Sequence, residues 1–170
     1  MSAAEEDEAP AVHGGHVDKF IGDGLLAVFG APEPLVGHAE WGVAAAREIA
    51  VVVHERFGSG LQIGIGVNSG PVVAGTIGGG GRLEFTVVGD VVNTAARVER
   101  VTRETGDDVL ITEATRLLLD QPKGVLPRGT VELQGKRDRV QLHALVDLPR
   151  LTPRMVERVD GESSERRQAG

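Results

Sequence analysis

The sequence predicts an α/β sandwich in which a mixed or antiparallel sheet is covered by helices. Two observations support this fold class: apolar runs of strand length alternate with stretches of helical periodicity, and several strand pairs are joined by short turns. At 170 residues the chain allows one domain with tails, long enough to bury a core. We place an acidic arm at residues 1–11, the domain at 12–147 and a disordered tail at 148–170.

The first part of the domain predicts a hairpin and a long helix. Residues 17–21 and 25–29 are apolar runs around Gly22-Asp23-Gly24, and an Asp-Gly turn between such runs is a strong hairpin signal. Residues 30–37, with two prolines, predict a loop. Helical spacing then marks residues 38–57 as a helix. Its expected buried side consists of Trp41, Ala45, Ile49, Val52, Val53 and Phe57.

Shorter elements follow this helix. Residues 61–67 alternate apolar side chains with polar or glycine positions, which predicts a strand whose glycines let another backbone or a ligand come close. Residues 72–77 indicate a further short strand. The glycine run 78–81 lacks the Lys-Ser/Thr and helix of a Walker loop, so we interpret it as a flexible turn. The remaining predictions are a strand at 109–112, a helix at 113–120 and a hairpin of 125–133 with 140–146.

Residues 85–99 contain two polar side chains that are candidates for binding an anion. The stretch predicts a β-branched strand, then Asp90 as the N-cap of a helix that ends near Gly106. Asn93 and Arg97 are four residues apart, so they share one exposed face near the positive end of that helix, which suits an anion. A solvated face is the alternative, because amphipathic helices ordinarily carry a polar side.

Two polar residues of the first hairpin are further candidates. Lys19 stands inside an apolar strand, where lysine is uncommon unless it lies at an edge or has a partner. Asp23 occupies the turn, a position that turn preferences alone explain.

Composition excludes several classes of function. The net charge of −7 argues against a nucleic-acid partner, because such proteins cluster Lys and Arg. Without cysteine there is no disulfide, thiolate catalysis or cysteine zinc site. No apolar run approaches the roughly 20 residues that span a bilayer, and no leader peptide is visible. We therefore expect a cytoplasmic protein with no membrane partner.

Three motifs stand in order along the chain: Val17-Asp18-Lys19-Phe20-Ile21-Gly22-Asp23-Gly24 with residues 27–32, then residues 65–75, then residues 85–99. Together they resemble the catalytic domain of class III adenylyl and guanylyl cyclases, over about residues 12–146. The resemblance implies the ferredoxin-like palm fold of that family. It also implies the conversion of ATP to 3′,5′-cyclic AMP and pyrophosphate in cyclic-nucleotide signalling.

The resemblance implies roles for the hairpin residues and for Thr86. Asp23 matches one of two aspartates that hold the divalent ions, Mg²⁺ or Mn²⁺, of the family. Lys19 matches the residue that hydrogen-bonds the base, and Thr86 matches the position that completes base selection. A lysine that donates to adenine N1 and a threonine that accepts from its exocyclic amine fit ATP, whereas the guanylyl pattern of Glu and Cys is absent.

The resemblance implies ribose and phosphate contacts for three further residues. Asn93 and Arg97 match the pair that supports the ribose and the phosphate under attack. Lys136 matches a lysine that neutralises the terminal phosphates, although a charged hairpin loop needs no function to explain it. The family's site lies between two catalytic domains, so the implied partner is a second cyclase domain in a homodimer or heterodimer.

One departure from the family pattern concerns its first element. The family begins with a strand carrying Phe-Ala-Asp-Ile/Val-x-Gly-Phe/Ser-Thr, which supplies the other metal aspartate, and then two helices; none of this precedes His13. We therefore expect an N-terminally truncated palm fold that lacks this strand and the helices, and no activity of these 170 residues alone. The alternative is a non-catalytic homologue that serves as a dimerisation or regulatory partner, or a relic.

Overall fold

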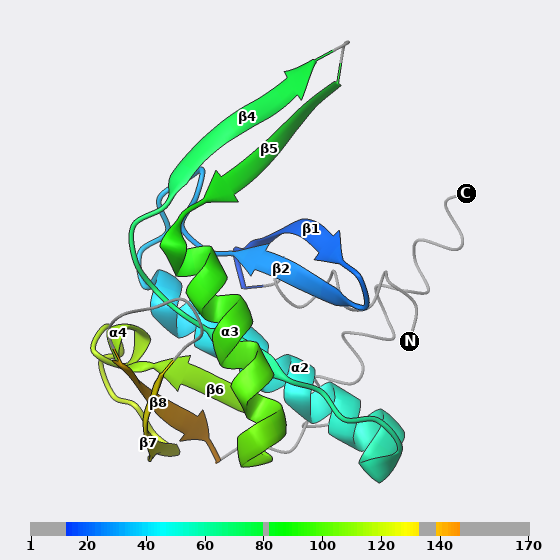
Figure 1. Ribbon diagram of the computed structural model, residues 1–170, viewed down its shortest axis with the longest axis vertical. Helices are drawn as coiled ribbons and strands as arrows, with labels where there is room; N and C mark the ends of the chain where they lie inside the picture. The colour runs from blue at the N-terminus through cyan, green and yellow to red at the C-terminus, as the bar shows by residue number, and fades with distance from the viewer. Residues whose placement is uncertain (1–12, 80–81, 133–138, 147–170) are drawn as a thin grey trace.

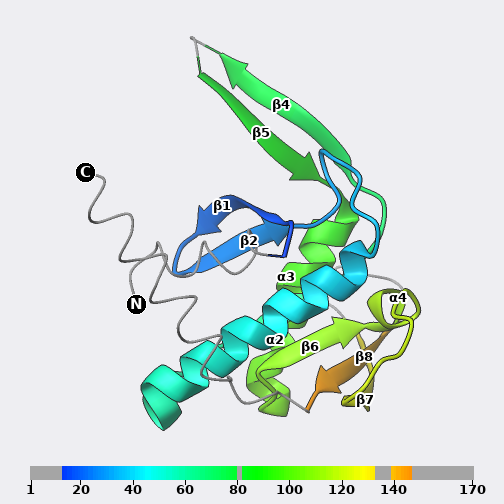
Figure 2. The ribbon, with the colours of Figure 1, turned by 180° about the vertical axis from the view of Figure 1, so that it is seen from behind.

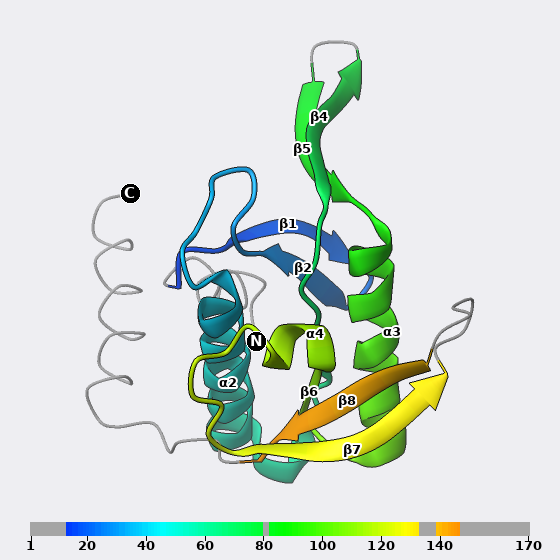
Figure 3. The ribbon, with the colours of Figure 1, turned by 90° about the vertical axis from the view of Figure 1, so that its left-hand side faces the viewer.

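The computed structural model describes residues 13–79, 82–132 and 139–146, and its centre has three layers. A four-stranded sheet lies between two helices, α2 (His38–Phe57) and α3 (Asp90–Thr105), as Figure 3 shows. Its strands, in spatial order, are β3 (Ile65–Val67), β6 (Val109–Thr112), β8 (Arg139–Leu145) and β7 (Val125–Glu132). The β3–β6 pair is parallel and the others are antiparallel, so the predicted mixed sheet covered by helices is confirmed.

Each face of the sheet has its own apolar core. Val109 and Ile111 of β6 pack toward α2, whereas Leu110 belongs to the cluster with α3. Since successive residues of a strand point to opposite faces, β6 is buried along its whole length. The helix residues in these clusters are Val43, Ala46 and Ala50 on α2, and Val98 and Val101 on α3.

Two hairpins lie at one end of this unit (Figure 1). β1 (His16–Ile21) pairs with β2 (Gly24–Val28), and β4 (Val73–Gly79) pairs with β5 (Arg82–Val88), both antiparallel. The β4–β5 hairpin projects away from the layers, while β1 packs against β5. Among the described strands, each hairpin is a two-stranded sheet of its own, and β3 is an edge strand of the larger sheet.

Two glycines allow α3 to lie directly against β3. A Cβ atom on Gly66 would overlap the backbone oxygen of Ala95 and the backbone nitrogen of Glu99. A Cβ atom on Gly64 would overlap the hydroxyl of Thr102. The close approach expected at these glycines is thus confirmed, and the approaching group is a helix backbone.

Two elements are shorter than predicted. The strand expected at 61–67 comprises only β3, because the β6 ladder begins with the bond from Ile65 N to Asp108 O (2.8 Å) and the residues before Ile65 have no strand opposite. A 3₁₀ turn, η1 (Gly58–Gly60), precedes them. The helix expected at 113–120 ends early as α4 (Glu113–Arg116). Leu117 and Leu118, which follow it, are exposed and offer little packing to extend the helix, while Leu119 packs against the core.

The structure also corrects two predictions about the long helices, the N-cap of α3 and the buried side of α2. α3 begins at Asp90 with Gly89 as its N-cap, so Asp90 lies in the first turn and is not the cap. On α2 the predicted buried side is wrong at its aromatic residues: Trp41 and Phe57 are 44% and 37% exposed. The small residues Ala46 and Ala50 belong instead to the core cluster with β6. Figure 2 shows α2 from behind, lying along the sheet. The buried set is Ala39, Gly42, Val43, Ala45, Ala46, Ala50, Val51 and Val53.

Candidate active site

The turn of the β1–β2 hairpin presents Asp23 to solvent. Ile21 pairs with Gly24, which leaves Gly22 and Asp23 as the two turn residues. Gly22 has φ of +66°, a left-handed conformation that suits glycine in a two-residue hairpin turn. Asp23 is exposed, so its carboxylate is accessible to a ligand.

Strand β1 contains a bulge at Asp18. Val17 pairs with Ala27 and Lys19 pairs with Leu26, so Asp18 is an extra residue with none opposite it on β2. In a regular strand, neighbouring side chains point to opposite faces. A bulge re-aims a side chain, and here it lets Asp18 and Lys19 reach the same atom of a third residue.

That atom is the hydroxyl oxygen of Thr86 on β5. Lys19 Nζ donates to Thr86 Oγ1 at 2.6 Å, and the Thr86 hydroxyl donates to Asp18 Oδ2 at 3.5 Å. Lys19 Nζ also lies 3.1 Å from Asp18 Oδ2. We call these three residues the Asp18–Lys19–Thr86 cluster.

The cluster is buried at its base and open at its tip. The Asp18 side chain is fully buried and Thr86 is 8% exposed, whereas 45% of the Lys19 side chain is exposed. Asp18 Oδ1 is buried and has no hydrogen-bond partner within the described part of the chain. Sequence reasoning missed Asp18; the available signal was a second charge beside Lys19 in an apolar strand.

Helix α3 carries the other two candidates one turn apart. Asn93 is exposed, as expected. Arg97 is half-buried, so its expected place on an exposed face is corrected: α3 lies on β3, and its flank is partly covered. Arg97 Nη1 is buried and has no hydrogen-bond partner among residues 13–79, 82–132 and 139–146. An unsatisfied guanidinium nitrogen is a donor available to an anion.

The start of α3 is fixed by Asn68, which follows β3. Its Nδ2 donates to the backbone oxygen of Val91 at 3.0 Å, and its Oδ1 accepts from Thr112 Oγ1 at 2.8 Å. These bonds, with the contact at Gly66, hold the helix that carries Arg97 in a set position on the sheet.

The structure brings Lys19 and Thr86 together although 67 positions separate them. Within the described residues, no direct hydrogen bond or ion pair joins that pair to Asp23 or to the two candidates on α3. Lys136 lies outside the described residues.

A divalent cation would find one ligand here. Asp23 supplies an exposed carboxylate, the hard oxygen donor that Mg²⁺ and Mn²⁺ prefer. No group of three or more His, Cys, Asp or Glu side chains in the described ranges is arranged to hold a metal. Asp23 therefore fits as a single oxygen ligand of such an ion.

The clearest pKa shifts belong to ion pairs in other parts of the fold. Arg116 and then His143 bond to the Glu113 carboxylate and hold its pKa at about 2. The hydrogen bond from Arg128 likewise lowers the pKa of Asp107. These pairs tie α4 to β8, and the end of α3 to β7.

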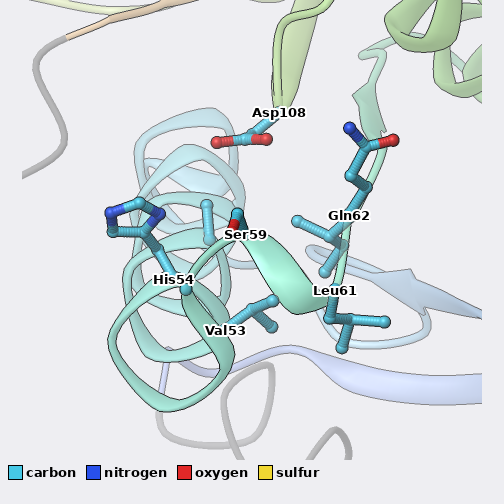
Figure 4. A pocket seen from close by; sticks show the side chains of 9 residues that line it. Val53, His54, Ser59, Leu61, Gln62 and Asp108 are labelled. Atoms are coloured by element: carbon cyan, nitrogen blue, oxygen red, sulfur yellow. The ribbon is translucent and has the colours of Figure 1, made fainter.

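A pocket of about 200 Å³ lies at the C-terminal end of α2 (Figure 4). His54, Gln62 and Asp108 are among its lining residues. None of the candidate site residues lines it, so it is separate from the Asp18–Lys19–Thr86 cluster.

The sequence model of the Adenylate and Guanylate cyclase catalytic domain matches residues 11–147. The chain belongs to this family. It is 32% identical over 145 residues to an adenylate cyclase of Anabaena cylindrica, a match that covers 76% of this chain and 28% of that protein. This cyclase-family chain spans less than a third of the length of the first curated relatives it matches.

Solved cyclase domains of both nucleotide types share the fold. The guanylate cyclase domain from Catenaria anguillulae, in complex with GTP, is 31% identical with a TM-score of 0.71, over 86% of this chain and 80% of that one. The adenylyl cyclase CyaB from P. aeruginosa is 26% identical with a TM-score of 0.68, over 86% and 79%. The palm fold of class III cyclases is therefore the fold of this chain. No helix that the structure describes combines the length and apolarity needed to cross a bilayer.

Proposed function

We propose that this cyclase-family chain supplies the base-binding and phosphate-stabilising residues of a site that converts ATP to 3′,5′-cyclic AMP and pyrophosphate. The site forms with a second cyclase domain, as a homodimer or heterodimer, and acts in cytoplasmic cyclic-nucleotide signalling. The observation that carries the proposal is the 2.6 Å bond between Lys19 Nζ and Thr86 Oγ1, which joins the two residues expected to bind the base.

The exposed tip of this pair suits an adenine edge. Lys19 is 45% exposed at its side chain and has donors but no acceptor. Thr86 Oγ1 already accepts from Lys19 and keeps a lone pair. A donor beside an acceptor matches adenine N1 and its exocyclic amine, which supports ATP as the nucleotide.

Asn93 and Arg97 are proposed to stabilise the charge that develops during the reaction. The ribose 3′-oxygen bonds to the α-phosphorus, the bond from that phosphorus to the bridging oxygen breaks, pyrophosphate leaves, and the hydroxyl proton passes to water. Charge accumulates on the phosphate oxygens, where fixed donors are most effective. The buried, unpartnered Nη1 of Arg97 supports this role, because such a donor is satisfied when an anion binds.

The metal-binding part of the proposal rests on Asp23. This residue would provide one oxygen ligand to Mg²⁺ or Mn²⁺, and Lys136 would contact the terminal phosphates. A bound divalent ion would neutralise phosphate charge. Since the described ranges hold no group of three or more side chains arranged to bind a metal, we propose that these 170 residues are inactive alone and depend on the carboxylates of another domain.

The same observation favours a second candidate function. A chain with one metal carboxylate can serve as a non-catalytic dimerisation or regulatory partner of an intact cyclase, or remain as a relic. Complementation separates these functions. The full chain is mixed with a cyclase domain that keeps both metal aspartates and has its base-binding lysine replaced by methionine, and cyclic AMP is measured with Mn²⁺ and ATP.

We expect cyclic AMP from the mixture and none from either protein alone. The Lys19→Met variant of this chain should abolish the activity of the mixture, whereas Lys123→Met serves as the matched control. Cyclic AMP from the chain alone would contradict the dependence on a partner. If the mixture forms no cyclic AMP, the composite site is contradicted and the interpretation of the chain as a non-catalytic relic remains.

A further inference from the structure

We propose that Asp18 is a positioning residue that sets which way the hydrogen bonds of Lys19 and Thr86 point, and through this sets the preference for adenine over guanine. The inference rests on the proposed function and adds to it a residue that contacts no substrate itself. It starts from the bulge of β1, which turns a fully buried carboxylate toward the same hydroxyl that Lys19 contacts.

The hydrogens of the cluster can be counted. A lysine ammonium has three donors, an ionised carboxylate only accepts, and a hydroxyl has one hydrogen and two lone pairs. Lys19 directs one hydrogen to Thr86 and one to Asp18, which leaves one. Thr86 accepts from Lys19 and directs its only hydrogen to Asp18. The cluster therefore presents one donor, from Lys19, and one acceptor, from Thr86.

This pairing is complementary to adenine and mismatched to guanine in the same position. Adenine offers an acceptor at N1 and a donor at its exocyclic amine. Guanine offers a donor at N1 and an acceptor at O6, so each contact would set donor against donor or acceptor against acceptor. Without Asp18, the Thr86 hydroxyl is free to rotate its hydrogen outward and donate to O6. By accepting the Thr86 hydrogen, Asp18 thus prevents a hydrogen bond from Thr86 to guanine O6.

Burial indicates that Asp18 is not retained for stability. Its side chain has no exposed area, and Oδ1 has no hydrogen-bond partner in the described part of the chain. A buried carboxylate oxygen without a partner is costly. The Lys19 side chain is 45% exposed, so water can solvate its ammonium group when Asp18 is removed. Replacement of Asp18 by valine should therefore leave a folded protein.

The competing explanation is that Asp18 only neutralises the charge of Lys19. Two variants separate the alternatives. Asp18→Val removes both the charge and the acceptor, whereas Asp18→Asn removes the charge but keeps an oxygen in the place of Oδ2. If hydrogen-bond direction matters, asparagine preserves the preference and valine loses it. If charge matters, both variants lose it.

The experiment uses the complemented mixture described above and measures kcat/KM for ATP and for GTP. Asp18→Val should lower the ATP-to-GTP ratio by about tenfold, which is the effect of one hydrogen bond, and should act mainly through KM. Asp18→Asn should keep the ratio within about threefold of the unsubstituted chain. Asp107→Asn is the matched control, because it also breaks an acidic contact, with Arg128, but in another part of the fold.

A double-mutant cycle tests whether Asp18 acts through Thr86. In a Thr86→Val background the hydroxyl is gone, so Asp18→Val should change the ATP-to-GTP ratio no further. Thermal unfolding identifies any variant that fails to fold, and Asp18→Ala replaces Asp18→Val in that case.

Each outcome decides a claim. An unchanged ratio in folded Asp18→Val, equal loss in Asp18→Asn, or additive loss in the Thr86→Val background overturns the role of Asp18 and leaves the composite site standing. A mixture with the unsubstituted chain that forms neither cyclic nucleotide overturns the proposed function, and the role of Asp18 with it.

Discussion

Lys19 Nζ lies 2.6 Å from Thr86 Oγ1 and thereby joins the first hairpin to the strand that leads directly into α3. Only Val87, Val88 and Gly89 separate Thr86 from that helix. The bond therefore relates the proposed base contacts to Asn93 and Arg97 through a short, regular length of backbone. Four predictions follow from this arrangement and from the contacts around it.

Replacement of Thr86 by valine should weaken the selection of ATP. The variant keeps the shape of the side chain but removes the acceptor proposed to bind the exocyclic amine. We expect KM for ATP in the complemented assay to rise by about three- to tenfold, the effect of one neutral hydrogen bond. Thr86→Ser, which keeps the hydroxyl, is the control and should retain most of the preference. An unchanged KM in Thr86→Val would remove Thr86 from the base site.

Replacement of Arg97 by methionine should separate function from stability. The complemented rate should fall by about 10²- to 10³-fold, the usual effect of removing one transition-state donor. The free energy of unfolding should change by less than about 1 kcal/mol or increase, because methionine keeps the packing stem and removes a buried, unsatisfied nitrogen. Thermal unfolding and the rate are measured on the same preparation.

The control for Arg97 lies further along the same helix. Arg103→Met breaks an exposed pair with Glu99 (2.9 Å) and should alter the rate little. If Arg97→Met lowers the unfolding midpoint strongly and leaves the rate intact, Arg97 is a structural residue.

A methyl group at Gly66 should displace α3. Gly66→Ala places a Cβ against the backbone of Ala95 and Glu99, and overpacking of this kind typically costs about 1 to 3 kcal/mol. Because α3 carries both phosphate candidates, complemented activity should fall as well. Gly60→Ala is the matched control, since an added Cβ there meets nothing within 4 Å. Equal effects of both variants on chemical denaturation would contradict the close packing of α3 on β3.

The Glu113 ion pair should make stability depend on pH in acid. Its folded pKa of about 2 lies below the ordinary value of 4.5, because Arg116 and His143 stabilise the carboxylate. The contribution is therefore fully present above pH 4.5 and is lost as pH falls toward 2. Glu113→Gln should be less stable than the unsubstituted chain at pH 6, and the difference should shrink across that window. Unfolding curves at pH 6, 4 and 3 test this, with the exposed Glu104→Gln as control.

Local patterns predicted most of the elements because their signals were short-range. The Asp-Gly turn fixed the first hairpin, and helical spacing located α2 and α3 to within a residue or two. The buried side of α2 could not be read in the same way: large apolar residues dominate the hydrophobicity of the helix, but Trp41 and Phe57 lie at its rim and small alanines face the sheet. Tertiary packing decided that orientation.

The sequence predicted individual residues of the candidate site but not the contacts between their side chains. The motifs placed Lys19 and Thr86, but only the bulge in β1 brings Asp18 to the same hydroxyl. A single extra residue in a strand leaves no periodic signature, so the sequence pattern did not reveal the bulge. The partial burial of Arg97 was missed because it depends on how closely α3 packs against the sheet at Gly64 and Gly66.

The short edge strand β3 has a consequence for assembly. Its main chain is paired with β6 on one side only among the described strands, and the β1–β2 ribbon is not joined to it. An edge strand with unpaired main-chain groups can bind an extended polypeptide through hydrogen bonds between backbone amides and carbonyls. A segment of a neighbouring subunit that paired with Ile65–Val67 would lie next to Asn68, which holds the start of α3. Such pairing would set the position of that subunit relative to Asn93 and Arg97.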